Sequence, residues 1–225
     1  MDDLTRKTAV GLGRFVVSLL ALVFLPAWSL RYWQGWLFVV VFGGAAIAIS
    51  LYLLKHDPQL LAKRLKAGPG AEKERSQKII QALASAGFVA LMVVPAVDHR
   101  LGWSRVPAWL VIAGDCLIAA GYAIVFFVFR ENSFTSSTVE IQEGQRVVSS
   151  GPYTVVRHPM YSGGLVLLAG VPLALGSWWA MLLLIPFAAL IVWRLVEEEK
   201  FLVERLAGYA RYRETVRWRL APGVW

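Results

Sequence analysis

Hydrophobic positions in this chain come in long runs, and the polar positions are gathered between the runs. Crossing the hydrocarbon core of a bilayer takes about 20 apolar residues at 1.5 Å each in a helix. Backbone groups in lipid must find their hydrogen bonds within their own segment, which favours helices. We therefore predict six helical spans, at Gly13–Leu30, Gly35–Leu54, Ile79–Val97, Val106–Phe129, Met160–Leu175 and Trp178–Val196.

Composition agrees with this pattern. Hydrophobic residues make up 57% of the chain, charged residues make up 17%, and the mean hydropathy is +0.57. These values are too apolar for a soluble domain of 225 residues. We expect an all-α integral membrane protein with a single domain over residues 1–225. Residues 1–129 hold the first four spans, and residues 130–225 hold a polar loop, a helical hairpin and a tail.

The basic residues predict an orientation. Of the 23 Lys and Arg residues, only Arg31, Arg100 and Arg105 fall in one set of loops, which leaves 20 on the other side. By the positive-inside rule, both termini are cytosolic, and six spans satisfy that condition. Topology and attraction to anionic lipids account for the net charge of +8, so we expect no nucleic-acid partner. The short loops suggest a bacterial inner membrane protein.

Two of the polar loops have patterns of their own. The loop Lys55–Lys78 alternates basic and apolar residues, which predicts a short amphipathic helix on the inner membrane surface. The loop Arg130–Pro159 alternates weakly around Glu143 and Gly144, which is typical of a small β-hairpin.

Candidates for metal binding and for intramembrane chemistry are few. Cys116 is the single cysteine, and the three histidines fall in three different loops, so we expect no metal site. Asp115 lies deep within a span, where acidic residues are functional candidates by default. The topology places it in the outer half of the membrane, so we predict a hydrogen-bonded structural residue.

Polar chemistry is gathered in two clusters. One is the segment 151–161, before the fifth span, and the other is Glu197-Glu198-Glu199, after the sixth. Counting 1.5 Å per residue along an antiparallel hairpin brings the glutamates to the depth of Arg157 and His158. A salt bridge that pins the hairpin would explain this arrangement. Three adjacent acids also repel one another, which favours a cationic ligand such as an ammonium or a sulfonium group.

At these residues the chain resembles a known family. The motif Arg157-His158-Pro159-Met160-Tyr161-Ser162-Gly163, followed by Glu198-Glu199, Leu202, Gly208, Tyr209 and Tyr212, is similar to the isoprenylcysteine carboxyl methyltransferase family. That family includes related bacterial phospholipid and small-lipid methyltransferases. The resemblance covers roughly Glu131 to the last residue.

The resemblance implies S-adenosylmethionine as methyl donor, held without a Rossmann fold. Carried onto this chain, the cofactor-binding residues are Arg157, His158, Pro159, Tyr161, Glu198 and Glu199. Glu197 has no counterpart in the family pattern. A carboxylate acceptor needs a cation to orient it, whereas an amine or hydroxyl acceptor must lose a proton. His158, Glu131 or a water could take that proton, and Glu131 and Asn132 are candidates for contacting the acceptor. The catalytic candidates are Glu131, Asn132 and Arg157.

The acceptor and two competing functions stay open. A prenylated cysteine carboxylate, the amine of phosphatidylethanolamine or another isoprenoid lipid would each suit a membrane enzyme, and each would enter through a lateral opening between helices. A sterol-reductase-like enzyme that uses NADPH has a comparable motif near its end. A transporter or scaffold is the third interpretation, although no inverted repeat is visible.

Overall fold

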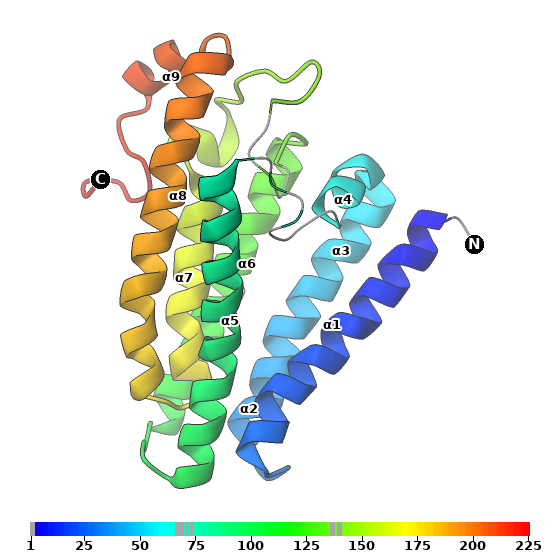
Figure 1. Ribbon diagram of the computed structural model, residues 1–225, viewed down its shortest axis with the longest axis vertical. Helices are drawn as coiled ribbons and strands as arrows, with labels where there is room; N and C mark the ends of the chain where they lie inside the picture. The colour runs from blue at the N-terminus through cyan, green and yellow to red at the C-terminus, as the bar shows by residue number, and fades with distance from the viewer. Residues whose placement is uncertain (1–2, 66–69, 71, 73, 136–137, 139–140) are drawn as a thin grey trace.

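A computed structural model of the chain describes residues 3–65, 70, 72, 74–135, 138 and 141–225. In that part of the chain the regular elements are all helices, and the long helices run side by side along the long axis of the molecule (Figure 1). Five of the described helices are long and apolar enough to cross a membrane: α1 (Asp3–Ala27), the continuous helix Trp33–His56, α5 (Arg75–Leu101), α6 (Ala108–Glu131) and the helix Trp179–Arg205.

Two of these spans are composite. The helix Trp33–His56 consists of α2 (Trp33–Phe38), the π-helical turn η1 (Val39–Gly43) and α3 (Gly44–His56). The last span begins with the 3₁₀ turn η4 (Trp179–Leu183) and continues as α8 (Leu184–Arg205). These helices confirm the all-helical membrane architecture.

The predicted fifth span is a shorter helix, α7 (Pro159–Ala174), of 16 residues. At 1.5 Å per residue it is about 24 Å long, against about 30 Å for the hydrocarbon core. Pro159 starts it, as is common at a first helical position, because the missing N–H has no partner there anyway. Gly176, with φ +71°, lies in the reversal toward α8. The predicted helical hairpin is confirmed, whereas a sixth full-length span is not.

Helix α7 packs very closely against α6. A Cβ atom built on Gly114 would lie 2.4 Å from the backbone nitrogen of Ala174, and one on Gly121 would lie 2.6 Å from the carbonyl oxygen of Gly163. Small residues let helix backbones approach in this way. The contact fixes the first turn of α7 beside the last turn of α6.

The opposite end of the bundle is tied together by a buried acid. Asp98 at the end of α5 accepts hydrogen bonds from the backbone nitrogen of Ser104 at 2.7 Å, from its hydroxyl at 2.6 Å, and from the hydroxyl of Ser177. Asp98 is fully buried. It therefore joins the α5–α6 loop to the turn between α7 and α8.

Within the described part of the chain, Asp115 does not make the hydrogen bonds that the sequence predicts for it. Its side chain is buried in α6, but neither carboxylate oxygen has a hydrogen-bond partner among the described residues. Its neighbours on the buried face of α6 are Val111, Gly114 and Ile118, which offer no polar side chain. The predicted hydrogen bonds are therefore wrong.

The two patterned loops are only partly as predicted. The loop after α3 does contain a short amphipathic helix, α4 (Pro58–Arg64), capped by the Asp57 side chain and burying Leu60 and Leu61. The predicted β-hairpin is not formed by the described residues of its loop, which have a turn at 142–145 and a 3₁₀ helix, η3 (Gly151–Thr154); residues 136–137 and 139–140 lie outside the described part. The Gln142 side chain bonds the carbonyl of Phe134 instead, at 2.8 Å.

Candidate functional site

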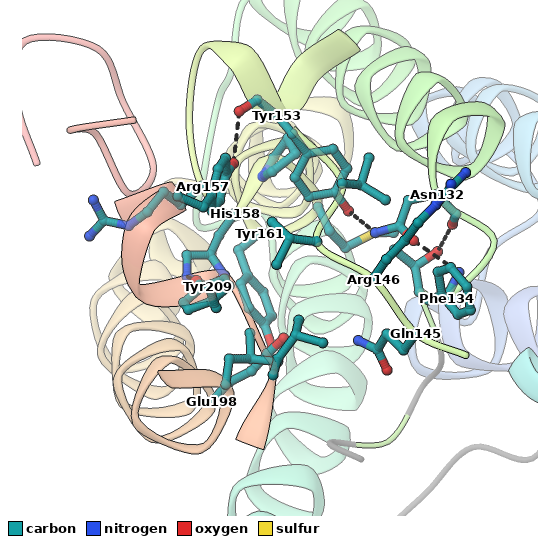
Figure 2. A pocket seen from close by; sticks show the side chains of 18 of the residues that line it. Asn132, Phe134, Gln145, Arg146, Tyr153, Arg157, His158, Tyr161, Glu198 and Tyr209 are labelled. Carbon is teal, nitrogen blue, oxygen red and sulfur yellow. Dashed lines mark hydrogen bonds between the residues drawn. The ribbon is translucent and has the colours of Figure 1, made fainter. Parts of the chain in front are cut away.

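A cavity of about 400 Å³ lies at the end of the bundle where α6 ends and α7 begins (Figure 2). Its walls come from Asn132 just after α6, the loop that follows, the start of α7, the end of α8 and the helix α9 (Tyr209–Thr215). Residues far away in the sequence complete it, because α4 contributes Arg64 and α5 contributes Gln81.

The structure brings most of the sequence-predicted site residues to this cavity. The lining includes Asn132, Arg157, His158, Pro159, Tyr161 and Glu198. Two predicted residues are placed elsewhere. The Glu131 carboxylate accepts a hydrogen bond from the Ser150 hydroxyl and packs against Gly151, and Glu199 is buried behind the cavity wall.

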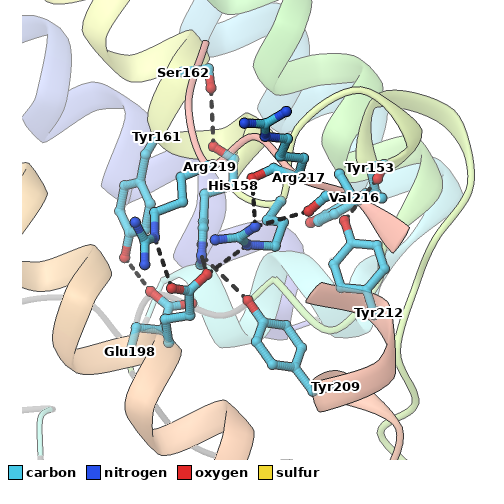
Figure 3. Close-up of polar contacts among 12 residues, drawn as sticks. Tyr153, His158, Tyr161, Ser162, Glu198, Tyr209, Tyr212, Val216, Arg217 and Arg219 are labelled. Carbon is cyan, nitrogen blue, oxygen red and sulfur yellow. Dashed lines mark hydrogen bonds and ion pairs between the residues drawn. The ribbon is translucent and has the colours of Figure 1, made fainter. Parts of the chain in front are cut away.

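Glu199 is the centre of a buried ion-pair cluster. Its side chain is only 6% exposed, and its two oxygens accept from Arg157 Nε at 2.7 Å and from Arg219 Nε at 2.9 Å. His158 Nε2 lies 3.5 Å from the first of these oxygens. One carboxylate thus joins α8, the residues just before α7 and the tail (Figure 3).

The tail is bound to the residues before α7 by its backbone. Arg157 Nη1 donates to the carbonyls of Val216 at 2.9 Å and Arg217 at 2.8 Å. The backbone nitrogens of Arg157 and His158 donate to the carbonyls of Trp218 and Arg219 at 2.8 and 3.0 Å. The donors of Arg157 therefore serve mainly to close the wall of the cavity with the tail.

Glu198, next in the chain, lines the cavity instead. Its Oε2 atom accepts from the Tyr161 hydroxyl, which in turn accepts from Arg194 Nε at 3.1 Å. Arg194 also pairs with Glu72 at 2.8 Å. This chain of hydrogen bonds holds an acidic side chain at the cavity. Figure 2 shows Glu198 beside Tyr161 there.

Four tyrosines, at positions 153, 161, 209 and 212, form an aromatic wall. The Tyr153 hydroxyl accepts from Asn132 Nδ2 at 2.9 Å, and the Tyr212 hydroxyl donates to the Tyr153 carbonyl at 2.7 Å. Burial raises the pKa of Tyr153 and raises the pKa of Tyr212 to about 12. Burial, together with the negative charges of Glu199 and Glu198, raises the pKa of Tyr209. These phenols are therefore neutral at ordinary pH.

Such a site suits a cation. Aromatic faces attract positive groups through the ring quadrupole, and a carboxylate among them adds a direct Coulomb attraction. Among the described residues, no group of three or more His, Cys, Asp or Glu side chains is arranged to hold a metal ion. The lining also contains arginines, at positions 64, 146, 157 and 194, so it offers groups for negative as well as positive charge.

Sequence reasoning missed several residues of the lining, notably Arg64, Gln81, Arg146 and Arg194. Arg64 and Gln81 reach the cavity only through tertiary packing, so no local pattern marks them. Arg194 falls within an apolar run, and an intramembrane cation could have been noticed on that ground. Arg146 is exposed in the loop after α6, and nothing in the pattern of that loop distinguishes it.

Comparison with known proteins gives a family match over part of the chain. No curated protein sequence matches the chain. The family model described as phospholipid methyltransferase matches residues 109–208, which hold both Arg157-His158-Pro159 and Glu198-Glu199. The match indicates a methyltransferase. It confirms the resemblance seen in the motif, because the matched family belongs to the isoprenylcysteine carboxyl methyltransferase-like group of membrane methyltransferases.

Proposed function

We propose that the protein transfers a methyl group from S-adenosylmethionine to a lipophilic acceptor at the cytosolic membrane face. The observation that carries the proposal is the Glu198 carboxylate, held by Tyr161 in a tyrosine-lined cavity; both residues lie in the matched region. The cavity volume of about 400 Å³ lies within the range usual for small-molecule sites. The family match also favours a methyl donor over NADPH.

The residues of the cavity suit the separate groups of the cofactor. Glu198 would engage the amino group, and the faces of Tyr153, Tyr161 and Tyr209 would surround positive charge. Arg146 is a cation of the lining suited to a carboxylate. His158 and Pro159 would shape the cavity wall around the bound cofactor. We assign Arg157 and Glu199 to positioning, because they bond to each other and to the tail.

When bound, S-adenosylmethionine supplies an electrophilic methyl group. The contribution of the protein to such an in-line displacement is to orient the two reactants and to exclude water. The tail, held by Arg157 and Arg219, closes one wall of the cavity. An amine or hydroxyl acceptor would also lose a proton, and His158 is the lining residue that we propose as its base. Asn132 would contact the acceptor.

Orientation belongs to the same proposal. The cavity end of the bundle carries α4, α9 and the start of α5 (Figure 1), and the neighbouring loops hold the large majority of the basic residues. By the positive-inside rule this end faces the cytosol, with both termini there, in a bacterial inner membrane. The cofactor would then enter from the cytosol and the acceptor from the bilayer.

Radiolabelled methyl transfer tests the proposal. Purified protein is incubated with methyl-labelled S-adenosylmethionine and a bacterial lipid extract, and lipid-soluble label is counted. Glu198→Gln should lower the incorporation about tenfold, as expected for a lost charge-assisted hydrogen bond of roughly 1.5 kcal/mol. Glu197→Gln is the matched control, because Glu197 pairs with Lys200 at 2.9 Å and does not line the cavity. Absence of label from every lipid fraction would overturn the proposal.

A further inference from the structure

An apolar groove lies between α5 and α8, and its lining differs completely from that of the polar cavity. It has a volume of about 400 Å³, and all eight residues that line it are apolar or glycine. On α5 they include Leu83 and Gly87, and on α8 they include Phe187, Leu190 and Trp193. Both helices are candidate membrane spans, so this groove faces hydrocarbon.

Gly87 of α5 faces Phe187 of α8. A Cβ atom built there would lie 3.0 Å from the ring of Phe187, which is tighter than an ordinary contact. A larger residue at position 87 would therefore push into Phe187 on the other wall of the groove. The small side chain of Ala189 leaves space in the lining.

The length of the groove matches one leaflet of a bilayer. Along the last span it runs from Leu183 at the end of η4 to Trp193 of α8, which is about 15 Å at 1.5 Å per residue. Half of the hydrocarbon core has about the same thickness. The groove can thus accommodate a hydrocarbon chain along its whole course through one leaflet.

The groove ends beside the polar cavity. Trp193 lines the groove, and Arg194, the next residue, lines the cavity. Arg194 bridges from α8 to Gln81 of α5 at 3.4 Å and contacts the Tyr161 hydroxyl that holds Glu198. The apolar groove and the polar cavity are therefore neighbours along α8, with Arg194 at their boundary.

We propose that this groove binds the hydrocarbon chain of the lipid acceptor and so presents its headgroup to the cavity past Arg194. The inference rests on the proposed methyl transfer. Between protein and lipid, packing rather than the hydrophobic effect decides which chain stays in a groove. A chain whose headgroup also reaches the cavity gains interactions that other bilayer lipids lack.

Two substitutions on α8 test the groove. Ala189→Trp fills it with a large side chain, whereas Ile185→Trp places the same side chain on a position that is 72% exposed and outside the lining. Both lie on the membrane-facing surface, so neither should disturb the core. Ala189→Trp should lower methyl incorporation into bacterial lipid extract about tenfold or more, because a displaced substrate reacts much more slowly. Ile185→Trp should leave it unchanged.

A binding measurement makes the test independent of turnover. Phosphatidylethanolamine with a photoreactive acyl chain is added at low mole fraction to nanodiscs of phosphatidylcholine that contain the protein. We expect saturable labelling of the groove residues of α8, competition by unmodified phosphatidylethanolamine, and loss of labelling in Ala189→Trp but not in Ile185→Trp. Labelling that never saturates, or that is equal in the two variants, would show bulk lipid only and overturn the inference.

Binding of S-adenosylmethionine separates the two proposals. It should be the same in wild type and both tryptophan variants, because neither position lines the polar cavity. If wild type binds the cofactor but Ala189→Trp still methylates normally, the groove assignment fails alone. If wild type does not bind S-adenosylmethionine, the proposed function itself is contradicted, independently of the groove.

Discussion

Replacing Glu199 with glutamine should loosen the tail and destabilise the fold. It should leave the acidic group that lines the cavity, Glu198, in place. Glu199 and Arg157 have side chains that are each 6% exposed, so their 2.7 Å ion pair is buried. Breaking a buried pair by removing one partner costs about 3–5 kcal/mol. Glutamine keeps one oxygen to accept from one arginine, so we expect the lower end, about 3 kcal/mol. The pair with Arg219, whose side chain is 29% exposed, adds no more than about 1 kcal/mol.

Thermal unfolding and limited trypsin digestion measure this effect in detergent. Trypsin cleaves after lysine and arginine, and the tail holds Arg217 and Arg219 in the stretch that Arg157 binds. We expect Glu199→Gln to unfold at a lower temperature and to lose its tail more quickly than wild type. Glu197→Gln is the control, since its partner Lys200 has a side chain that is 65% exposed and the pair contributes no more than about 0.5 kcal/mol. Equal stability and equal cleavage in the two variants would refute the assignment of Glu199 to positioning.

Three further predictions follow from contacts at and near the site. Gly114→Ala should destabilise the protein by about 1–3 kcal/mol in chemical unfolding because its Cβ meets backbone of α7, whereas Gly164→Ala, with nothing within 4 Å, should not; equal effects would contradict the close α6–α7 packing. Tyr161→Phe should weaken binding of S-adenosylmethionine about tenfold in calorimetry, because Glu198 loses its donor, and Tyr52→Phe outside the cavity should leave it unchanged. Burial raises the pKa of Tyr212 from 10.0 to about 12. The stability that the neutral phenol contributes is therefore complete below pH 10 and is lost as the pH rises to 12. The unfolding temperature should fall between pH 10 and 12, and should fall less in Tyr212→Phe.

The sequence was sufficient for the helices and for the meeting of the two polar clusters. Long apolar runs specify helices in a membrane, and a rise of 1.5 Å per residue fixes depth along a hairpin. Arg157 and Glu199 indeed lie 2.7 Å apart, although 42 positions separate them. The proline at position 159 and the glycine at position 176 marked the ends of α7 for the same local reasons.

The sequence did not specify which glutamate faces the cavity. Neighbouring residues on a helix point about 100° apart, so Glu198 and Glu199 exchange places if α8 rotates by that angle. The rotation is set by packing across the bundle, including the fully buried Leu195. The same reason explains why Arg64 of α4 was missed and why Glu131 was expected to reach the acceptor, although its carboxylate bonds Ser150.

Calorimetric titration of the purified protein with S-adenosylmethionine tests the central claim most directly. We predict saturable binding by wild type, unchanged binding by Glu197→Gln, and at least about tenfold weaker binding by Glu198→Gln. Parallel titration with NADPH should give no saturable heat. A folded protein that does not bind S-adenosylmethionine, or whose binding is insensitive to Glu198→Gln, would contradict the account.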